Sequence, residues 1–176
     1  MKSLKEIYLQ FSTQSPIDGG DKGTVHSYID YYEESLKPFR DNAKKVLEIG
    51  INNGHSLMMW NEYFYNADII GVDLRIPNID INCLMIQGDA TDPETFRNLN
   101  SLDVIVDDGS HKLNHQLESF EILFPLLNDG GIYIIEDIVN IDKTEDIFLK
   151  LSKNVKIFDF RHIKNRSDDV IVQIIK

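Results

Sequence analysis

The sequence is poor in cysteine, and Cys83 is the only one among its 176 residues. A single thiol excludes an internal disulfide and favours a reducing compartment, so we expect a cytoplasmic protein. Long apolar runs are also missing, because no stretch reaches the ~18 residues that a membrane helix needs. Residues 1–6 lack the apolar core of a signal peptide. These absences predict that a membrane is not a partner.

Positive charge is scarce as well, since 18 Lys and Arg residues against 29 Asp and Glu residues give a formal net charge of −11. Such a chain is repelled by nucleic acid phosphates unless its basic residues gather on one face. The densest basic stretch, residues 161–166, is predicted to be a solvated loop. We therefore expect no nucleic acid partner, and a substrate that is small and either neutral or assisted by a cation.

Short apolar runs alternate with helical patterns along most of the chain, which is typical of βαβ units and a parallel sheet. Strands are expected over 46–49, 69–72, 83–86, 102–106 and 132–135, and an antiparallel hairpin over 155–160 and 170–175. Helices are expected near 57–64, 93–99, 113–127 and 144–151. The pattern predicts a Rossmann-like, doubly wound α/β sheet, mostly parallel with a C-terminal antiparallel strand.

Residues 1–40 lie outside this alternation and are predicted to form a cover of loop (12–24) and helix over the mouth of the sheet, with the ligand-binding domain at 41–176. The cover carries four large aromatic side chains, Tyr28, Tyr31, Tyr32 and Phe39. Exposed aromatic patches often bind a second subunit, so a homo-oligomer is one expectation. Burial of the same tyrosines against their own sheet is the alternative.

In open parallel sheets a ligand binds outside the carboxyl ends of the strands, where helix N-termini also point. Nearly every predicted strand here is followed by acidic residues: Glu48, Asp73, Asp89, Asp107, Asp108, Glu136 and Asp137. One such residue is commonly just a helix cap or part of a loop. Acids at five successive strand ends instead predict a ligand site at this edge.

The turn after the first strand reads Glu48-Ile49-Gly50-Ile51-Asn52-Asn53-Gly54. A dinucleotide fingerprint would place glycine at 50, 52 and 55, but Asn52 and His55 stand at two of these positions. The spacing Glu-x-Gly-x-x-x-Gly instead resembles the first motif of class I methyltransferases. By that resemblance Asp73 would hold the ribose hydroxyls of S-adenosylmethionine, and Asp89 would lie beside its adenine.

Asp108, Glu136 and Asp137 end two adjacent predicted strands, so their oxygens can converge on one hard cation such as Mg²⁺. A substrate hydroxyl on that cation loses its proton more easily. His111 begins the next helix, and an imidazole accepts a proton near neutral pH. His111 and His115 could suggest Zn²⁺, but a third ligand is missing nearby. Magnesium is therefore the preferred interpretation, with helix capping as the alternative for these residues.

At this point the sequence resembles the sugar O-methyltransferases of macrolide antibiotic biosynthesis, of the mycinamicin type. The resemblance covers about residues 20 to 140, and its most specific parts are Asp107-Asp108-Gly109-Ser110-His111 and Ile135-Glu136-Asp137. Other matching stretches are Asp21-Lys22-Gly23-Thr24 with His26 and Tyr28, Leu47-Glu48-Ile49-Gly50, Ser56-Leu57 to Trp60, Val72-Asp73 and Gly88-Asp89.

The resemblance implies that Asp108, Glu136 and Asp137 hold Mg²⁺ and that His111 is the general base. It also implies a set of residues that contact S-adenosylmethionine: Lys22, Tyr28, Glu48, Gly50, Asn52, Ser56, Asp73, Asp89 and Asp107. Two features depart from that family. An extra N-terminal domain is absent from this sequence, and a longer aromatic-bearing loop is missing after Asp137. Both missing parts shape the acceptor pocket of that family. The assignments of cofactor and metal residues therefore carry over to this sequence better than the identity of the substrate.

The sequence thus predicts a magnesium-dependent O-methyltransferase that acts on a hydroxyl of a small molecule, such as a sugar or another vicinal diol. One alternative is a module that binds S-adenosylmethionine without catalysis, which would need none of Asp108, His111, Glu136 and Asp137. A second alternative is a nucleotide-dependent oxidoreductase, which Asn52 and His55 disfavour. Fold alone does not separate these functions.

Overall fold

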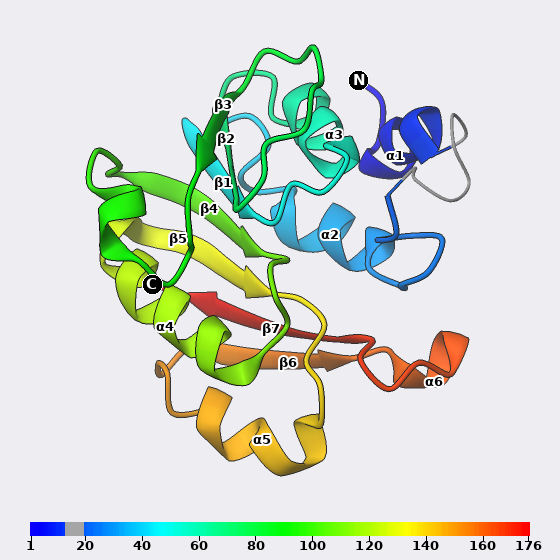
Figure 1. Ribbon diagram of the computed structural model, residues 1–176. Helices are drawn as coiled ribbons and strands as arrows, with labels where there is room; N and C mark the ends of the chain where they lie inside the picture. The colour runs from blue at the N-terminus through cyan, green and yellow to red at the C-terminus, as the bar shows by residue number, and fades with distance from the viewer. Residues whose placement is uncertain (13–19) are drawn as a thin grey trace.

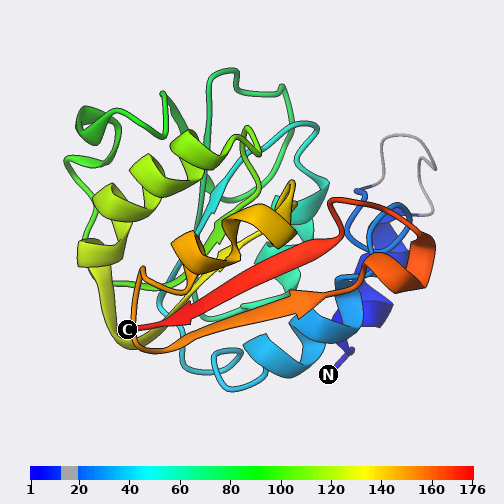
Figure 2. The ribbon, with the colours of Figure 1, turned by 90° about the horizontal axis from the view of Figure 1, so that it is seen from below.

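The computed structural model describes residues 1–12 and 20–176, in which a seven-stranded sheet is flanked by helices on both faces (Figure 1). The strands are β1 Lys45–Ile49, β2 Asp68–Asp73, β3 Leu84–Gln87, β4 Leu102–Asp107, β5 Leu127–Ile135, β6 Val155–Asp159 and β7 Val170–Ile175. Their order is β3-β2-β1-β4-β5-β7-β6, and β7 runs antiparallel to both of its neighbours (Figure 2). The predicted fold class is confirmed.

The helices are α1 Leu4–Ser12, α2 Ile29–Leu36, α3 His55–Tyr63, α4 Leu113–Leu123, α5 Ile141–Phe148 and α6 Arg161–Lys164, with 3₁₀ turns at Pro93–Phe96 and Phe124–Leu126. In both ribbon views α1, α2 and α3 lie on one side of the sheet, and α4 and α5 lie on the other (Figures 1 and 2). Within residues 1–12 and 20–176, no helix combines the length and the apolar character that crossing a bilayer requires.

Successive side chains of the central strands point to opposite faces of the sheet and are apolar on both, which explains why helices cover both faces. In β4, Val104 and Val106 pack with the α1–α3 side, whereas Ile105 packs with the α4–α5 side. β5 repeats the pattern, because Ile134 faces the first side and Tyr133 the second. All these side chains are fully buried. The apolar runs of the sequence therefore fix both the strands and the edge where they end.

The aromatic residues of the cover pack against their own sheet. Tyr28, Tyr31 and Tyr32 are each at most 6% exposed. The ring of Tyr31 lies 4.7 Å from that of Phe158 in β6, and its hydroxyl lies 3.0 Å from the amide oxygen of Gln173 in β7. The alternative stated above is the correct one, so these tyrosines offer no exposed surface to a second subunit.

Helix α2, which the sequence placed over the mouth of the sheet, packs instead on one face, in the same core cluster as Val46 and Val104. The residues at the mouth belong to the turn at 20–28 and to helix α1. The rest of the expected loop, residues 13–19, lies outside the described residues. Three backbone carbonyls of the turn, those of Gly23, Thr24 and His26, accept hydrogen bonds from the ammonium of Lys164. Residues 161–166 were expected to form a solvated loop. They form the helical turn α6 instead, and its Lys164 anchors the turn at 20–28.

The predicted end of helix α4 is also wrong. The α-helix stops at Leu123, because Pro125 has no N–H group with which to continue the hydrogen-bond ladder, and a 3₁₀ turn at Phe124–Leu126 follows. β5 begins as early as Leu127, which pairs with Leu102, and the next paired residues are Ile132 and Val104. The intervening glycines, 130 and 131, form an irregularity inside the strand rather than a helix cap.

Gly50, directly after β1, allows the first and fourth strand ends to come together. Its φ is +90°, and a Cβ added there would lie 2.1 Å from the carbonyl oxygen of Asp108. A non-glycine residue would therefore carry both a strained backbone and a clash with another backbone, which cannot rotate away. Glycine at position 50 is therefore needed to bring β1 and β4 together at the site.

Gly50→Ala is expected to lower the free energy of unfolding by about 3 kcal/mol, since the left-handed backbone and the clash add. Urea denaturation measures this change. Gly130→Ala is the matched control, because its φ is also positive, at +79°, while nothing lies within 4 Å of the added Cβ. The control is expected to cost only about 1 kcal/mol. Equal losses in the two variants would contradict the close approach.

Candidate active site

A cavity of about 460 Å³ opens at the carboxyl ends of β1, β2 and β4. Its floor is the turn after β1, and Tyr8 and Phe11 of α1 form part of its wall. Five of the residues predicted to bind the cofactor line it, namely Lys22, Gly50, Asn52, Ser56 and Asp73. Asp108 and His111 also line it, so the predicted metal and base residues face the same space.

Asp73, at the end of β2, organises the glycine-containing turn. Its carboxylate accepts hydrogen bonds from the backbone N–H groups of Ile51 at 2.8 Å, Asn52 at 3.3 Å and Arg75 at 3.0 Å. Asn52 has a φ of 46°, a left-handed conformation that asparagine tolerates better than most residues. The carboxylate therefore fixes the turn while it lines the cavity.

Glu48 lies beneath the cavity rather than on its wall. It is fully buried and accepts hydrogen bonds from the Ser56 hydroxyl at 2.6 Å and the Trp60 indole N–H at 3.0 Å. Burial raises the pKa of Glu48 to about 7, although the nearby Lys22 ammonium opposes the shift. Glu48 thus supports Ser56 from below, a role that its place in the sequence motif did not reveal.

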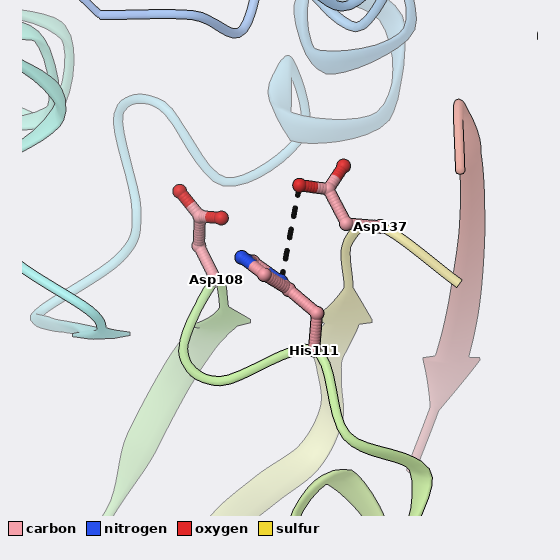
Figure 3. Close-up of side chains that lie close together, drawn as sticks. All are labelled: Asp108, His111 and Asp137. Carbon is pink, nitrogen blue, oxygen red and sulfur yellow. Dashed lines mark ion pairs between the residues drawn. The ribbon is translucent and has the colours of Figure 1, made fainter. Parts of the chain in front are cut away.

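Asp108, His111 and Asp137 come together at the ends of β4 and β5 (Figure 3). One potential ligand atom from each lies within 4.8 Å of the others, and His111 Nδ1 is 3.8 Å from Asp137 Oδ2. Both His111 and Asp137 have a φ of 55°. Left-handed backbone at two non-glycine residues is costly and concentrates at functional sites. His111 Nδ1 is also buried without a hydrogen-bond partner.

Glu136 is held away from this group of three. Its carboxylate accepts hydrogen bonds from the Lys22 ammonium at 2.5 Å and from the Tyr32 hydroxyl, and its backbone carbonyl accepts one from the Gln116 amide at 3.0 Å. Burial, and then the charge of Asp108, raise the pKa of Glu136 well above its ordinary value. Of the three predicted metal ligands, the structure groups Asp108 and Asp137 with His111 and places Glu136 on Lys22.

Asp137 is supported from the cover. Its Oδ1 accepts a hydrogen bond from the Tyr28 hydroxyl at 2.6 Å and lies 3.2 Å from His26 Nδ1. The rings of His26 and Tyr28 stack with centroids 4.9 Å apart. Tyr28, predicted as a cofactor contact, therefore touches a predicted metal ligand instead. His26, to which the sequence assigned no role, is 3% exposed and belongs to the same network.

Asp169 escaped the sequence analysis altogether. It is fully buried, accepts a hydrogen bond from the Ser27 N–H at 3.1 Å, and lies 3.4 Å from His26 Nδ1. A signal existed, because an antiparallel strand begins at the edge where parallel strands end. The residue before β7 therefore reaches the same edge as Asp108 and Asp137.

Asp89 and Asp107, both predicted to contact the cofactor, are not among the cavity-lining residues. Asp89 accepts hydrogen bonds from the N–H and the hydroxyl of Thr91, at 2.9 and 2.8 Å, as a turn residue does. Asp107 is buried and accepts from the Ser119 hydroxyl at 2.7 Å and the Gly109 N–H at 3.3 Å. Burial raises the pKa of Asp107 to about 6.

No family model matches the chain. Among curated proteins, it is 37% identical over 137 residues to 8-demethyl-8-alpha-L-rhamnosyl tetracenomycin-C 2'-O-methyltransferase of Streptomyces olivaceus, a match that covers 68% of this chain and 35% of the relative. It is 38% identical over 128 residues to L-olivosyl-oleandolide 3-O-methyltransferase of Streptomyces antibioticus, covering 65% and 33%. The chain thus spans about a third of the length of these relatives.

Among solved structures, the chain superposes on the MycE methyltransferase of the mycinamycin biosynthetic pathway, in complex with Mg, SAH and mycinamycin VI, with a TM-score of 0.77. The sequences are 22% identical, and the match covers 99% of this chain and 54% of that one. The fold is that of the class I methyltransferases. The resemblance to the sugar O-methyltransferases of macrolide biosynthesis is confirmed, because the curated relatives carry such names.

Asp107→Asn is expected to stabilise the protein more at pH 8 than at pH 5. A carboxyl group whose folded pKa is raised keeps its proton in the folded state, so stability falls as pH rises from about 4 to about 6. The asparagine variant lacks this penalty, which amounts to at most about 3 kcal/mol for a two-unit shift. Urea denaturation of both proteins at the two pH values measures it. A pH-independent difference between them would show that the buried carboxyl titrates normally.

Proposed function

We propose that this chain carries the cofactor- and metal-binding part of an S-adenosylmethionine-dependent, magnesium-dependent O-methyltransferase. Its acceptor would be a hydroxyl of a small molecule, a sugar or another vicinal diol, as the names of the relatives suggest. The observation that carries the proposal is the grouping of Asp108, His111 and Asp137 beside a cavity lined by the glycine turn. The cytoplasmic location, the homo-oligomer and the domain division at residue 40 stay predictions.

The cavity fits S-adenosylmethionine in size and chemistry. Its volume of about 460 Å³ lies within the range of roughly 300–1,000 Å³ that is usual for small-molecule sites. Asp73 would accept hydrogen bonds from the ribose hydroxyls, and Gly50, Asn52 and Ser56, which also line the cavity, would contact the rest of the ligand. Glu48 would support Ser56, and Asp107 would stabilise the turn before His111. We assign these two residues to the support of the site rather than to direct contact.

The residues around His111 also fit a divalent cation. Asp108 and Asp137 present carboxylates, and Glu136 stands one residue from Asp137. Carboxylate oxygens are ligands that Mg²⁺ prefers. When bound, Mg²⁺ would supply Lewis acidity that makes an acceptor hydroxyl easier to deprotonate.

The chain's own residues would do the remaining work by position. His111 lines the cavity, and its unpaired Nδ1 is available to accept a proton from the acceptor hydroxyl. Tyr28 and His26 hold Asp137 in place, which fixes the distance between the carboxylate and His111. The contribution of such a site is mainly proximity and charge stabilisation.

Binding of S-adenosylhomocysteine is expected to raise the melting temperature, because a ligand that binds only the folded state stabilises it. Asp73→Ala should remove most of this shift, because the cavity loses both its acid and the anchor of the glycine turn. Differential scanning fluorimetry measures both effects. Asp89→Ala serves as the control, and should keep the shift, because Asp89 bonds only within its own turn. A shift with NAD but not with S-adenosylhomocysteine would favour the oxidoreductase instead.

Methyl transfer is expected to stop in a chelator, while S-adenosylhomocysteine still binds. His111→Ala should lose roughly 10²–10⁴-fold in rate, the usual contribution of a positioned base, and Glu136→Gln should lose metal dependence and activity together. A panel of sugars and catechols with neighbouring hydroxyls supplies the acceptor, and the transferred methyl group is counted by radiolabel. Full activity in chelator, or an unchanged rate in His111→Ala, would overturn the metal- and base-assisted mechanism and leave the fold and the cofactor site standing.

A further inference from the structure

Lys22 occupies an unexpected place in the site. The sequence resemblance assigns it to the cofactor, and it does line the cavity. Its ammonium, however, lies 2.6 Å from Asp108 Oδ2 and 2.5 Å from Glu136 Oε1, and 3.5 Å from Glu48 Oε1. The side chain is only 3% exposed. One monovalent cation thus pairs with two of the three carboxylates predicted to hold the divalent cation.

Electrostatics keep the ammonium there. Three carboxylates, those of Asp108, Glu136 and Glu48, lie within 3.5 Å of the buried ammonium and attract it. A divalent cation on the same carboxylates would lie within a few ångströms of the ammonium, and like charges repel strongly in a buried site. The two cations therefore compete for Asp108 and Glu136.

The side chain can leave without disturbing the backbone. The Lys22 carbonyl accepts a hydrogen bond from the Tyr28 N–H at 2.9 Å, and Lys164 holds the three carbonyls of the same turn named above. The lysine stem is flexible, so rotation of its own bonds can carry the ammonium from the acids into the cavity. There it would meet the carboxylate end of an amino-acid cofactor.

We propose that Lys22 is a positioning residue that exchanges between the Asp108–Glu136 carboxylates and the carboxylate of the bound cofactor, and so couples metal binding to cofactor binding. This inference rests on the proposed function. A divalent cation displaces the ammonium from the acids, and the displaced ammonium then strengthens cofactor binding. Because such coupling is reciprocal, the cofactor strengthens metal binding by the same factor.

Isothermal titration calorimetry with S-adenosylhomocysteine tests the coupling, in saturating Mg²⁺ and in EDTA. Wild-type protein is expected to bind about tenfold more tightly with Mg²⁺, within the usual range of coupling between sites. In Lys22→Met the ratio should fall below about twofold, since no ammonium is exchanged. Lys153→Met is the matched control, because Lys153 is exposed and remote from the cavity lining, and it should keep the wild-type ratio.

Chemical labelling of wild-type lysines follows the ammonium directly and needs no variant. Acetylation followed by mass spectrometry should find Lys22 protected in EDTA, reactive in Mg²⁺ alone, and protected again in Mg²⁺ with S-adenosylhomocysteine. Electron paramagnetic resonance should show that Mn²⁺ binds Lys22→Met more tightly than wild type without cofactor, because the competing cation is gone.

The outcomes distinguish failure of the Lys22 exchange from failure of the proposed methyltransferase function. Lys22 that stays protected in Mg²⁺, or an equal Mg²⁺ effect in wild type and Lys22→Met, overturns the exchange and leaves the methyltransferase standing. S-adenosylhomocysteine that binds neither with nor without Mg²⁺ overturns the proposed function itself.

Discussion

Carboxylates crowd the carboxyl edge of this sheet, and their mutual repulsion is the constraint on which the rest of the site depends. Glu48 and Glu136 are at most 1% exposed, and burial raises the pKa of each. Buried charges are tolerated only when they are paired or hydrogen-bonded. The neighbouring elements supply those partners: Trp60 and Ser56 from α3, Tyr32 from α2, and Lys22 from the turn between α1 and α2.

Most of the fold could be predicted from the sequence, because apolar runs and helical spacing carry the topology. The strands lie where they were expected, including the antiparallel hairpin formed by β6 and β7. The errors fall where a local signal competes with pairing. The glycines at 130 and 131 are typical of a helix end, but strand β4 recruits Leu127 before them. The basic run at 161–166 is typical of a solvated loop, but its lysine bonds to backbone carbonyls that only the folded chain brings near.

The residues of the candidate site also divide into those that the sequence could predict and those that it could not. Asp108, His111 and Asp137 were predictable because each follows a strand end, and the order of strands brings those ends together. The pairing of Lys22 with the acids could not be predicted, because Lys22 does not follow a strand. Asp169 precedes an antiparallel strand, and that weaker signal was not used. Their positions depend on how the first and last segments fold over the edge. A sequence motif identifies which residues lie together at the site. The hydrogen-bond partners of each carboxylate oxygen depend instead on contacts across the whole chain.

Those contacts make the two ends of the described chain depend on each other. Ser27 donates its N–H to Asp169, Tyr28 donates its hydroxyl to the Asp168 carbonyl, and Lys164 bonds the carbonyls of the same turn. The connection between β6 and β7 thus fixes the turn that carries Lys22, His26 and Tyr28. Because residues of that turn bind Asp137 and Glu136, the geometry of the acidic edge is set by segments that contribute no predicted metal ligand. The site is therefore a property of the whole fold rather than of the central sequence motif alone.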